Sequence, residues 1–249
     1  MERADKVKPE SLRPKEKPAA IRSMRALLAA SLHKRVPYEV ALAERDFIVL
    51  PDVFSPAYFF DSRFFASTVP GFVAPEERFL ELGSGIGAVS VLAALRGAIV
   101  TAIDINPEAV RNTKLNAERH GVTSKVRALY GDIFSPLDAD DQFELIFWNI
   151  PFAHTRHRIL TIMEQAIFDP GYKTMNRFLS SSLPFLAAGG QILIGFSSTL
   201  GDIVALQTHA RRAHLEIEGP IAAARDPDPG PLGQIQYELY RAWPSLEGQ

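Results

Sequence analysis

The sequence predicts an α/β fold: a doubly wound sheet of about seven strands, mostly parallel, with an antiparallel C-terminal edge. From residue 78 onward, short apolar runs alternate with segments of helical periodicity, which is the pattern of a parallel sheet covered by helices. The last two apolar runs, residues 215–219 and 235–243, have no helix between them and are expected to pair as antiparallel strands. Of the 249 residues, 47% are hydrophobic and 22% are charged, as in ordinary globular proteins.

The N-terminal part differs from the rest in charge. The first 35 residues contain ten Lys or Arg and four Asp or Glu, whereas the whole chain has a net charge of −2. Residues 1–19 are polar and rich in proline and are expected to form a flexible basic leader, with an arm that binds nucleic acid as the alternative. Residues 20–75 are expected to form a helical segment that acts as a lid. Its predicted elements are helices at 20–35 and 57–68, with short extended pieces at 47–56.

Residues 76–249 are expected to form the main domain. Its predicted strands are residues 78–82, 98–104, 125–130, 143–149 and 191–196. Its predicted helices are residues 86–97, 106–121, 174–190 and 200–214. The second of these helices has clear boundaries, with Asn106 as N-cap, Pro107 at the first helical position and Gly121 beyond the end. The third is expected to stop at a glycine pair.

Several classes of protein are excluded. The chain has no cysteine, so it has neither disulfides nor thiolate sites, and a reducing, cytoplasmic location is expected. No apolar run is long enough to span a membrane, and the N-terminus lacks the apolar core of a secretory signal. The two histidines in HTRH have no obvious third ligand nearby, so no metal is expected.

A glycine loop, ELGSGIGA at residues 81–88, joins the first main-domain strand to the first helix. It fits the G-x-G-x-x-G/A pattern, in which glycines permit a tight turn and close approach of a ligand. Asp104 ends the next strand, where a carboxylate can accept hydrogen bonds from both hydroxyls of a ribose. NAD and S-adenosylmethionine both carry such a ribose, so an NAD-dependent oxidoreductase and an S-adenosylmethionine enzyme both fit these residues.

Two acids favour S-adenosylmethionine. Glu81 lies two residues before the first glycine, and a carboxylate there would repel a pyrophosphate but suits an ammonium and a sulfonium. Asp132 follows the third strand, where a second carboxylate can accept a hydrogen bond from an adenine amino group.

From about residue 45 to its end, the chain resembles the class I S-adenosylmethionine-dependent methyltransferases. ELGSGIG resembles their first motif, TAIDINPEAV their second and GDIF their third. The resemblance implies a Rossmann-like domain that transfers a methyl group and releases S-adenosylhomocysteine. The expected cofactor contacts are Glu81, Gly83, Ser84, Gly85, Gly87, Asp104, Ile105, Asp132, Ile133 and Asn149.

The fourth predicted strand ends in an unusual turn of Asn149, Ile150, Pro151 and Phe152. The turn resembles the Asn-Pro-Pro-Tyr/Phe motif of amino-methyltransferases of the glutamine-N5 and rRNA-guanine type. An amide or base nitrogen is a weak nucleophile, and two carbonyl oxygens that accept its N–H groups can hold it facing a methyl group. Asn149 and the Ile150 carbonyl would supply those oxygens, Pro151 would stiffen the turn and Phe152 could stack on the substrate. Ile150 replaces the first proline of the motif, so an oxygen or carbon acceptor stays open.

Aromatic residues before the glycine loop resemble the segment that lies over the cofactor in the same group. Phe54 and Phe59 are the expected substrate contacts there, and Phe60 is a further candidate for covering the adenine or the substrate. Packing in the core is the other common fate of such rings.

The loop at residues 153–173 is long for a strand-to-helix connection and is expected to overlie the substrate. His154, Arg156 and His157 are its candidate substrate contacts. The acidic body favours a small molecule, peptide or protein as substrate over rRNA or tRNA. A non-catalytic scaffold with the same fold is the remaining alternative.

Overall fold

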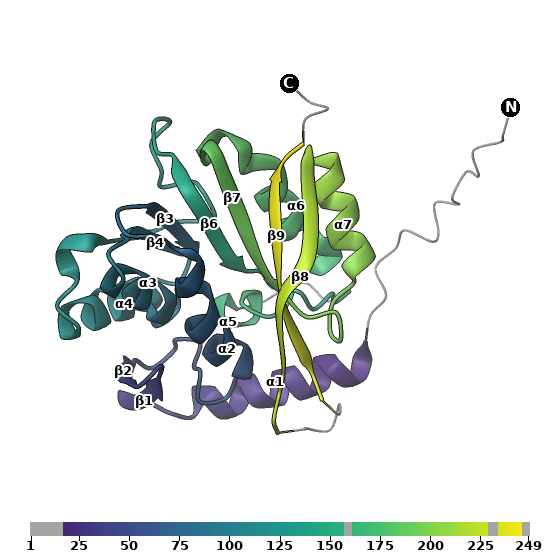
Figure 1. Ribbon diagram of the computed structural model, residues 1–249. Helices are drawn as coiled ribbons and strands as arrows, with labels where there is room; N and C mark the ends of the chain where they lie inside the picture. Colours follow the sequence, from purple (N-terminus) through teal and green to yellow (C-terminus); the bar gives the residue numbers. More distant parts are fainter. Residues whose placement is uncertain (1–16, 157–160, 229–233, 246–249) are drawn as a thin grey trace, which may run out of the picture.

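The computed structural model describes residues 17–156, 161–228 and 234–245, and it contains a seven-stranded sheet (Figure 1). The strands lie in the order β5-β4-β3-β6-β7-β9-β8. They are β3 Arg78–Leu82, β4 Ile99–Asp104, β5 Val126–Tyr130, β6 Phe143–Asn149, β7 Leu186–Phe196, β8 Leu215–Arg225 and β9 Gln236–Pro244. Neighbours from β5 to β7 run parallel, and β9 runs antiparallel to both β7 and β8. This sheet confirms the predicted fold class.

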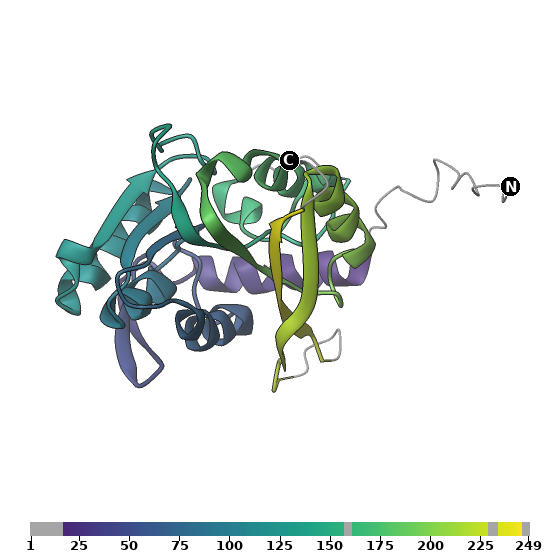
Figure 2. The same ribbon diagram turned by 45° about the horizontal axis from the view of Figure 1, so that its top comes forward.

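Helices cover both faces of the sheet (Figure 2). They are α2 Phe60–Thr68, α3 Ala88–Leu95, α4 Pro107–Arg119, α6 Lys173–Ser181 and α7 Ile203–Arg212. Consecutive residues of β6 point to opposite faces, and each meets a helix. Phe147 packs on Phe65 of α2, with ring centroids 5.7 Å apart, whereas Trp148 meets Phe178 of α6 edge-on at 5.1 Å. The central strands are therefore apolar on both sides, as the sequence of β6 already indicates.

An N-terminal cover packs against this domain. It comprises α1 Pro18–Leu32, the hairpin strands β1 Tyr38–Leu42 and β2 Arg45–Val49, and α2. In Figure 1, α1 runs along the lower edge of the molecule, below α5 and α2. The extended pieces expected at residues 47–56 overlap β2, but the hairpin as such is not among the predicted elements. Its two-residue turn consists of Ala43 and Glu44, at φ 47° and 59°, and so lacks the Asn or Gly that usually marks such a turn.

Two fully buried amides of α4 dock the hairpin on the main domain. The Asn112 side-chain oxygen accepts the Leu50 N–H at 2.8 Å, and the Asn112 and Asn116 amides both donate to the Ile48 carbonyl at 2.8 Å. These side-chain amides satisfy backbone groups of residues 48 and 50 that lack a strand partner, so the end of β2 and the residue after it are fixed on α4.

The predicted helix at 174–190 is wrong at its C-terminal end. Helix α6 ends at Ser181, a 3-10 turn spans Leu183–Phe185, and β7 begins at Leu186. The pyrrolidine of Pro184 removes a backbone donor, and Leu186 pairs with Phe143 before a register shift resumes the ladder at Gln191. The glycine pair therefore lies within β7 rather than ending a helix. The predicted strand at 215–219 is likewise too short, since β8 continues to Arg225.

Helix α1 begins inside the expected leader of residues 1–19, of which residues 1–16 lie outside the described part. The division of the chain at residues 75 and 76 stays a prediction. In the part of the chain that the structure describes, no helix combines the length and apolarity that crossing a membrane requires.

Candidate active site

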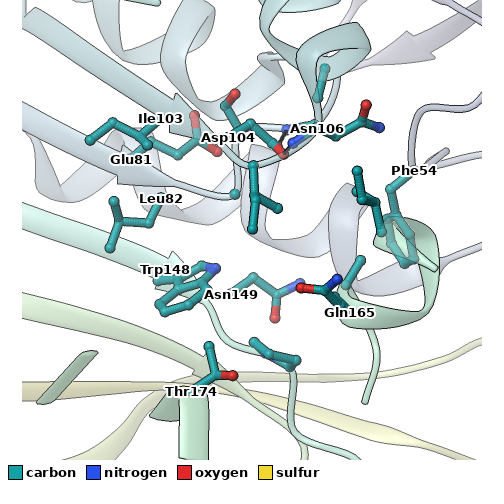
Figure 3. Close-up of a pocket in the computed structure, with 18 of the residues that line it drawn as sticks. Phe54, Glu81, Leu82, Ile103, Asp104, Asn106, Trp148, Asn149, Gln165 and Thr174 are labelled. Carbon is teal, nitrogen blue, oxygen red and sulfur yellow. Dashed lines mark hydrogen bonds between the residues drawn. The ribbon is translucent and has the colours of Figure 1, made fainter. Parts of the chain in front are cut away.

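A cavity of about 650 Å³ lies at the carboxyl ends of β3, β4 and β6 (Figure 3). Strand β3 has β4 on one side and β6 on the other, so the chain changes direction across the sheet here. Such a switch point is where doubly wound sheets bind ligands, and a volume of about 300–1,000 Å³ is usual for these sites. The glycine loop, the strand ends, the N-terminal cover and residues 162–177 all contribute to the wall.

The three glycines of the loop have different roles. A Cβ on Gly83, at φ +65°, would lie 2.8 Å from Nε1 of Trp148. Gly85, at φ +55°, donates its backbone N–H to Oδ2 of Asp104 at 2.9 Å. A Cβ on Gly87 would lie 2.8 Å from the Thr113 Cα, so this glycine lets α3 approach α4. Gly83, Ser84 and Gly85 line the cavity, whereas Gly87, an expected cofactor contact, lies outside the lining.

Two buried carboxyl groups face the cavity from β3 and β4. Oδ1 and Oδ2 of Asp104 accept the backbone N–H groups of Asn106 at 2.8 Å and Gly85 at 2.9 Å. Oε2 of Glu81 accepts both the backbone N–H of Ser90, at 2.9 Å, and its hydroxyl. Burial raises the pKa of Glu81 to about 8 and that of Asp104 to about 6. A cationic ligand would offset the cost of ionising both groups in one cavity.

The third predicted acid is more exposed. Asp132 forms an ion pair with Arg177 of α6, with Oδ2 and Nη2 2.6 Å apart. The next residue, Ile133, has φ 55°, an uncommon conformation for a β-branched side chain. Both residues line the cavity together with Ile105, and their contact with a cofactor stays a prediction.

Asn149 lies at the end of β6, and Figure 3 shows its side chain between Asp104 and Thr174. Its Nδ2 donates to Oδ2 of Asp61 at 2.8 Å. Its Oδ1 is buried and accepts no hydrogen bond from the residues that the structure describes. The Ile150 backbone N–H donates to the Gly195 carbonyl at 3.2 Å, which fixes the turn on β7. An unpaired buried acceptor is uncommon in proteins and calls for a functional explanation.

The rest of the predicted turn divides into lining and packing residues. Pro151 lines the cavity. Ile150 and Phe152 are buried behind it, and Phe152 packs edge-on against Phe196 with ring centroids 6.1 Å apart. The Phe152 ring is therefore part of the core and does not face the cavity.

The expected substrate contacts are only partly brought together. Phe54 lines the cavity and stacks on Phe59 at 4.0 Å, but Phe59 borders a different hollow beside α1. His154 is buried outside the cavity lining, where Nδ1 accepts the Gly171 N–H at 2.9 Å, so the structure does not bring it to this cavity. Arg156 is exposed and outside the lining. His157 lies outside the described residues.

The segment after the turn does overlie the cavity, as its length predicts. Its short helix α5, Ile162–Gln165, supplies lining residues, and Phe168 follows. Helix α1 supports this segment: Arg25 pairs with Glu164 at 3.4 Å and lies 5.5 Å from the centre of the Phe168 ring. No cluster of three or more His, Cys, Asp or Glu within residues 17–156, 161–228 and 234–245 is arranged to hold a metal ion.

Several residues at the site are absent from the sequence prediction. They are Asn106, Trp148, Gln165, Lys173, Thr174 and Arg177 in the lining, and Asp61 behind Asn149. Asp61 alone leaves a signal in the sequence, because it is a single acid within the aromatic run YFFDSRFF.

Residues 44–217 match the methyltransferase small domain family. The match covers more than half of the chain, and the chain therefore belongs to that family. This confirms the predicted resemblance to class I methyltransferases.

Among curated relatives, the release factor glutamine methyltransferase of Bordetella pertussis is 35% identical over 136 residues, covering 50% of this chain and 48% of that protein. The Rhodopirellula baltica protein of the same name is 29% identical over 142 residues, covering 52% of this chain and 47% of that protein. The ribosomal protein uL3 glutamine methyltransferase of Bradyrhizobium diazoefficiens is 37% identical over 78 residues, covering 30% and 24%. The chain thus spans half or less of the length of these relatives.

Solved structures share the fold. A 16S rRNA methyltransferase of T. thermophilus, in complex with AdoMet and guanosine, has a TM-score of 0.58 at 18% identity, covering 84% of this chain and 50% of that chain. A tRNA methyltransferase of M. jannaschii has a TM-score of 0.60 at 16% identity, covering 85% of this chain and 58% of that chain. These matches confirm the Rossmann-like architecture.

Proposed function

We propose that this chain is an S-adenosylmethionine-dependent methyltransferase that methylates a planar nitrogen, with a glutamine side chain of a peptide or protein as the leading acceptor. The observation that carries the proposal is the unpaired Oδ1 of Asn149, held in the wall of the cavity that also contains Glu81 and Asp104. The names of the curated relatives support the choice of a glutamine amide over other nitrogens.

The cavity suits the cofactor. When bound, S-adenosylmethionine supplies an electrophilic methyl group on a positively charged sulfur. Asp104 retains lone pairs for a ribose diol beyond the two that its backbone partners use. Glu81 offers a buried carboxylate to a cation, and Gly83 and Gly85 let the backbone approach the ligand. Asp132, Ile133 and Ile105 would border the adenine.

The chain's own part in the reaction is positioning. Oδ1 of Asn149 would accept one N–H of the acceptor amide, and the carbonyl of Ile150, a residue just behind the cavity lining, is the candidate acceptor for the other. Together they would turn the nitrogen lone pair toward the methyl group and favour the pyramidal geometry of attack. Because Oδ1 is buried, a neighbouring cavity side chain must move slightly for the substrate to reach it. The new bond then recovers about 1–3 kcal/mol that an unpaired buried acceptor costs.

Two measurements test the proposal. Calorimetry with S-adenosylhomocysteine should show binding at a single site, and NAD should not stabilise the protein in a melting assay. Transfer of a labelled methyl group from S-adenosylmethionine should then be compared among a glutamine-containing peptide, a guanine-containing RNA and small amides. Absence of S-adenosylhomocysteine binding would overturn the assignment, and transfer to RNA alone would replace the peptide with a nucleic-acid base.

A base nitrogen is the second candidate, because an exocyclic amino group presents the same two N–H donors to the same pair of oxygens. The solved relative with guanosine bound has a fold of this kind. Oxygen and carbon acceptors of small molecules offer no such pair of donors and rank below both. The cytoplasmic location stays a prediction.

A further inference from the structure

We propose that Asp61 is a positioning residue that sets the orientation of the Asn149 carboxamide and thereby decides which of its two ends is left for the substrate. The inference rests on the proposed nitrogen methylation, in which the substrate meets the oxygen of Asn149 and not its nitrogen. Asp61 is 4% exposed and lies outside the cavity lining, so it acts through Asn149 and does not touch the substrate.

The two ends of a carboxamide have almost the same shape, so a hydrogen-bond partner must distinguish them. An ionised carboxylate can only accept hydrogen bonds. Oδ2 of Asp61 therefore selects Nδ2 of Asn149, 2.8 Å away, and the opposite end is left as an acceptor without a donor. A substrate N–H requires an acceptor, and the reversed carboxamide would present a second donor instead.

Helix α2 stabilises the carboxylate that makes this selection. Asp61 lies in the first turn of α2, where the helix dipole favours a negative charge. Its Oδ1 accepts the Ser62 backbone N–H at 2.8 Å, so both oxygens have a donor. Burial raises the pKa of Asp61, while the bonds from Asn149 and Ser62 oppose that rise and the negative charge of Asp226 adds to it. Tyr237 of β9 is the further titratable group that faces this carboxyl.

The packing of α2 shows that the contact depends on a close approach to the sheet. Asp61 and Asn149 are 88 positions apart in the chain. A Cβ on Gly195 of β7 would lie 2.7 Å from Cζ of Phe65 and 3.0 Å from the Asn149 Cα. A side chain at position 195 would therefore press on both α2 and the end of β6, the two elements that bring Asp61 and Asn149 together.

The first test observes the carboxamide directly and needs no substrate. The ¹⁵N–¹H side-chain resonances of Asn149 are assigned by their loss in Asn149→Ala. In Asp61→Asn these resonances should shift and exchange faster, because the amide loses a charge-assisted bond. Asp52→Asn is the matched control, the same exchange at an exposed carboxylate in the same segment, and should leave them unchanged. Unchanged Asn149 resonances in Asp61→Asn would overturn the proposal.

The second test uses turnover of a glutamine-containing peptide. Asp61→Asn should lower kcat by roughly 10- to 100-fold while S-adenosylhomocysteine affinity stays within about twofold. In an Asn149→Ala background, Asp61→Asn should cause almost no further loss of kcat. If Asp61 acts only through the Asn149 side chain, its effect on kcat disappears once that side chain is removed. Additive losses would mean that Asp61 is only structural. Failure of the wild type to methylate any acceptor would count against the proposed function, whereas the resonance test would still decide the role of Asp61.

Discussion

The two sides of the cavity, the proposed cofactor side with Glu81 and Asp104 and the proposed acceptor side with Asn149, are built in different ways. On the proposed cofactor side, Glu81 meets Ser90 nine positions on and Gly85 meets Asp104 19 positions on, and the polar contact from Asp132 to Arg177 joins positions 45 apart. On the acceptor side, Asn149 meets Asp61, 88 positions away. The first half is thus built within the main domain, largely from the neighbouring strands β3 and β4, whereas the second half depends on how the N-terminal cover packs on the sheet. Changes to the two halves should separate cofactor binding from turnover.

The largest effect is expected from Asn149→Ala. Losing the acceptor oxygen should lower kcat about 10²- to 10³-fold, as loss of one positioned hydrogen-bonding group does in other active sites. Binding of S-adenosylhomocysteine, followed by calorimetry, should change little. A variant that loses turnover and cofactor binding together would show that the two halves are not separable.

Asp104→Asn should affect the cofactor side. It replaces a charged acceptor by a neutral amide that must present a donor to one of its two partners. The loss of a hydrogen bond to a charged group, about 1.5–3 kcal/mol, corresponds to roughly 10- to 150-fold weaker binding of S-adenosylhomocysteine. Turnover at saturating S-adenosylmethionine should fall much less. A change in kcat with unaltered affinity would contradict the ribose contact.

Gly195→Ala should act on the acceptor side through packing. The added methyl group would overlap the Phe65 ring at 2.7 Å and push α2 away from β6. Overpacking of this kind lowers the free energy of unfolding by about 1–3 kcal/mol. Denaturant titration measures that loss, and kcat should fall while cofactor affinity is kept. Equal stability of variant and wild type would show that α2 has room to adjust.

The smallest effect concerns the pH dependence of stability. The pKa of Glu81 rises from 4.5 to about 8 in the folded protein, so Glu81 contributes stability that is complete below pH 4.5 and is lost as the pH rises through 8. The melting temperature of the ligand-free protein should therefore fall between about pH 4.5 and pH 8 and level off above pH 8. Asp104, whose pKa rises to about 6, adds a smaller decrease below pH 6. Glu81→Gln should flatten this dependence. An equal pH dependence of the melting temperature in both proteins would contradict the raised pKa of Glu81.

The predictions from sequence succeed where local pattern determines the structure. The limits of β3 and β6 are those predicted, because apolar runs bounded by turn residues define a buried strand. The Asn106 side chain accepts the Glu108 N–H as an N-cap, again as predicted. The predicted start of β7 is wrong. The glycine pair at residues 189 and 190 indicated the end of a helix, but pairing with β6 makes these residues part of the strand.

At the site, the same division holds. Glu81, Asp104 and Asn149 are brought together because parallel strands all deliver their carboxyl ends to one edge. Asp61 has no motif of its own, and its partner is set by tertiary packing alone. His154 shows the opposite case. Its neighbours in sequence suggest an exposed loop, but its side chain is buried away from the cavity, where the Gly171 N–H provides a hydrogen-bond partner.

Helix α1 lies before residue 44, where the family match begins, yet it supports α5 and Phe168 over the cavity. The cavity wall beside Asn149 is thus supported from outside the segment that the family model matches, whereas Glu81 and Asp104 lie inside that segment. A change at Arg25 of α1 is therefore expected to act on α5 and Phe168 and to leave the glycine loop, which it does not contact, in place.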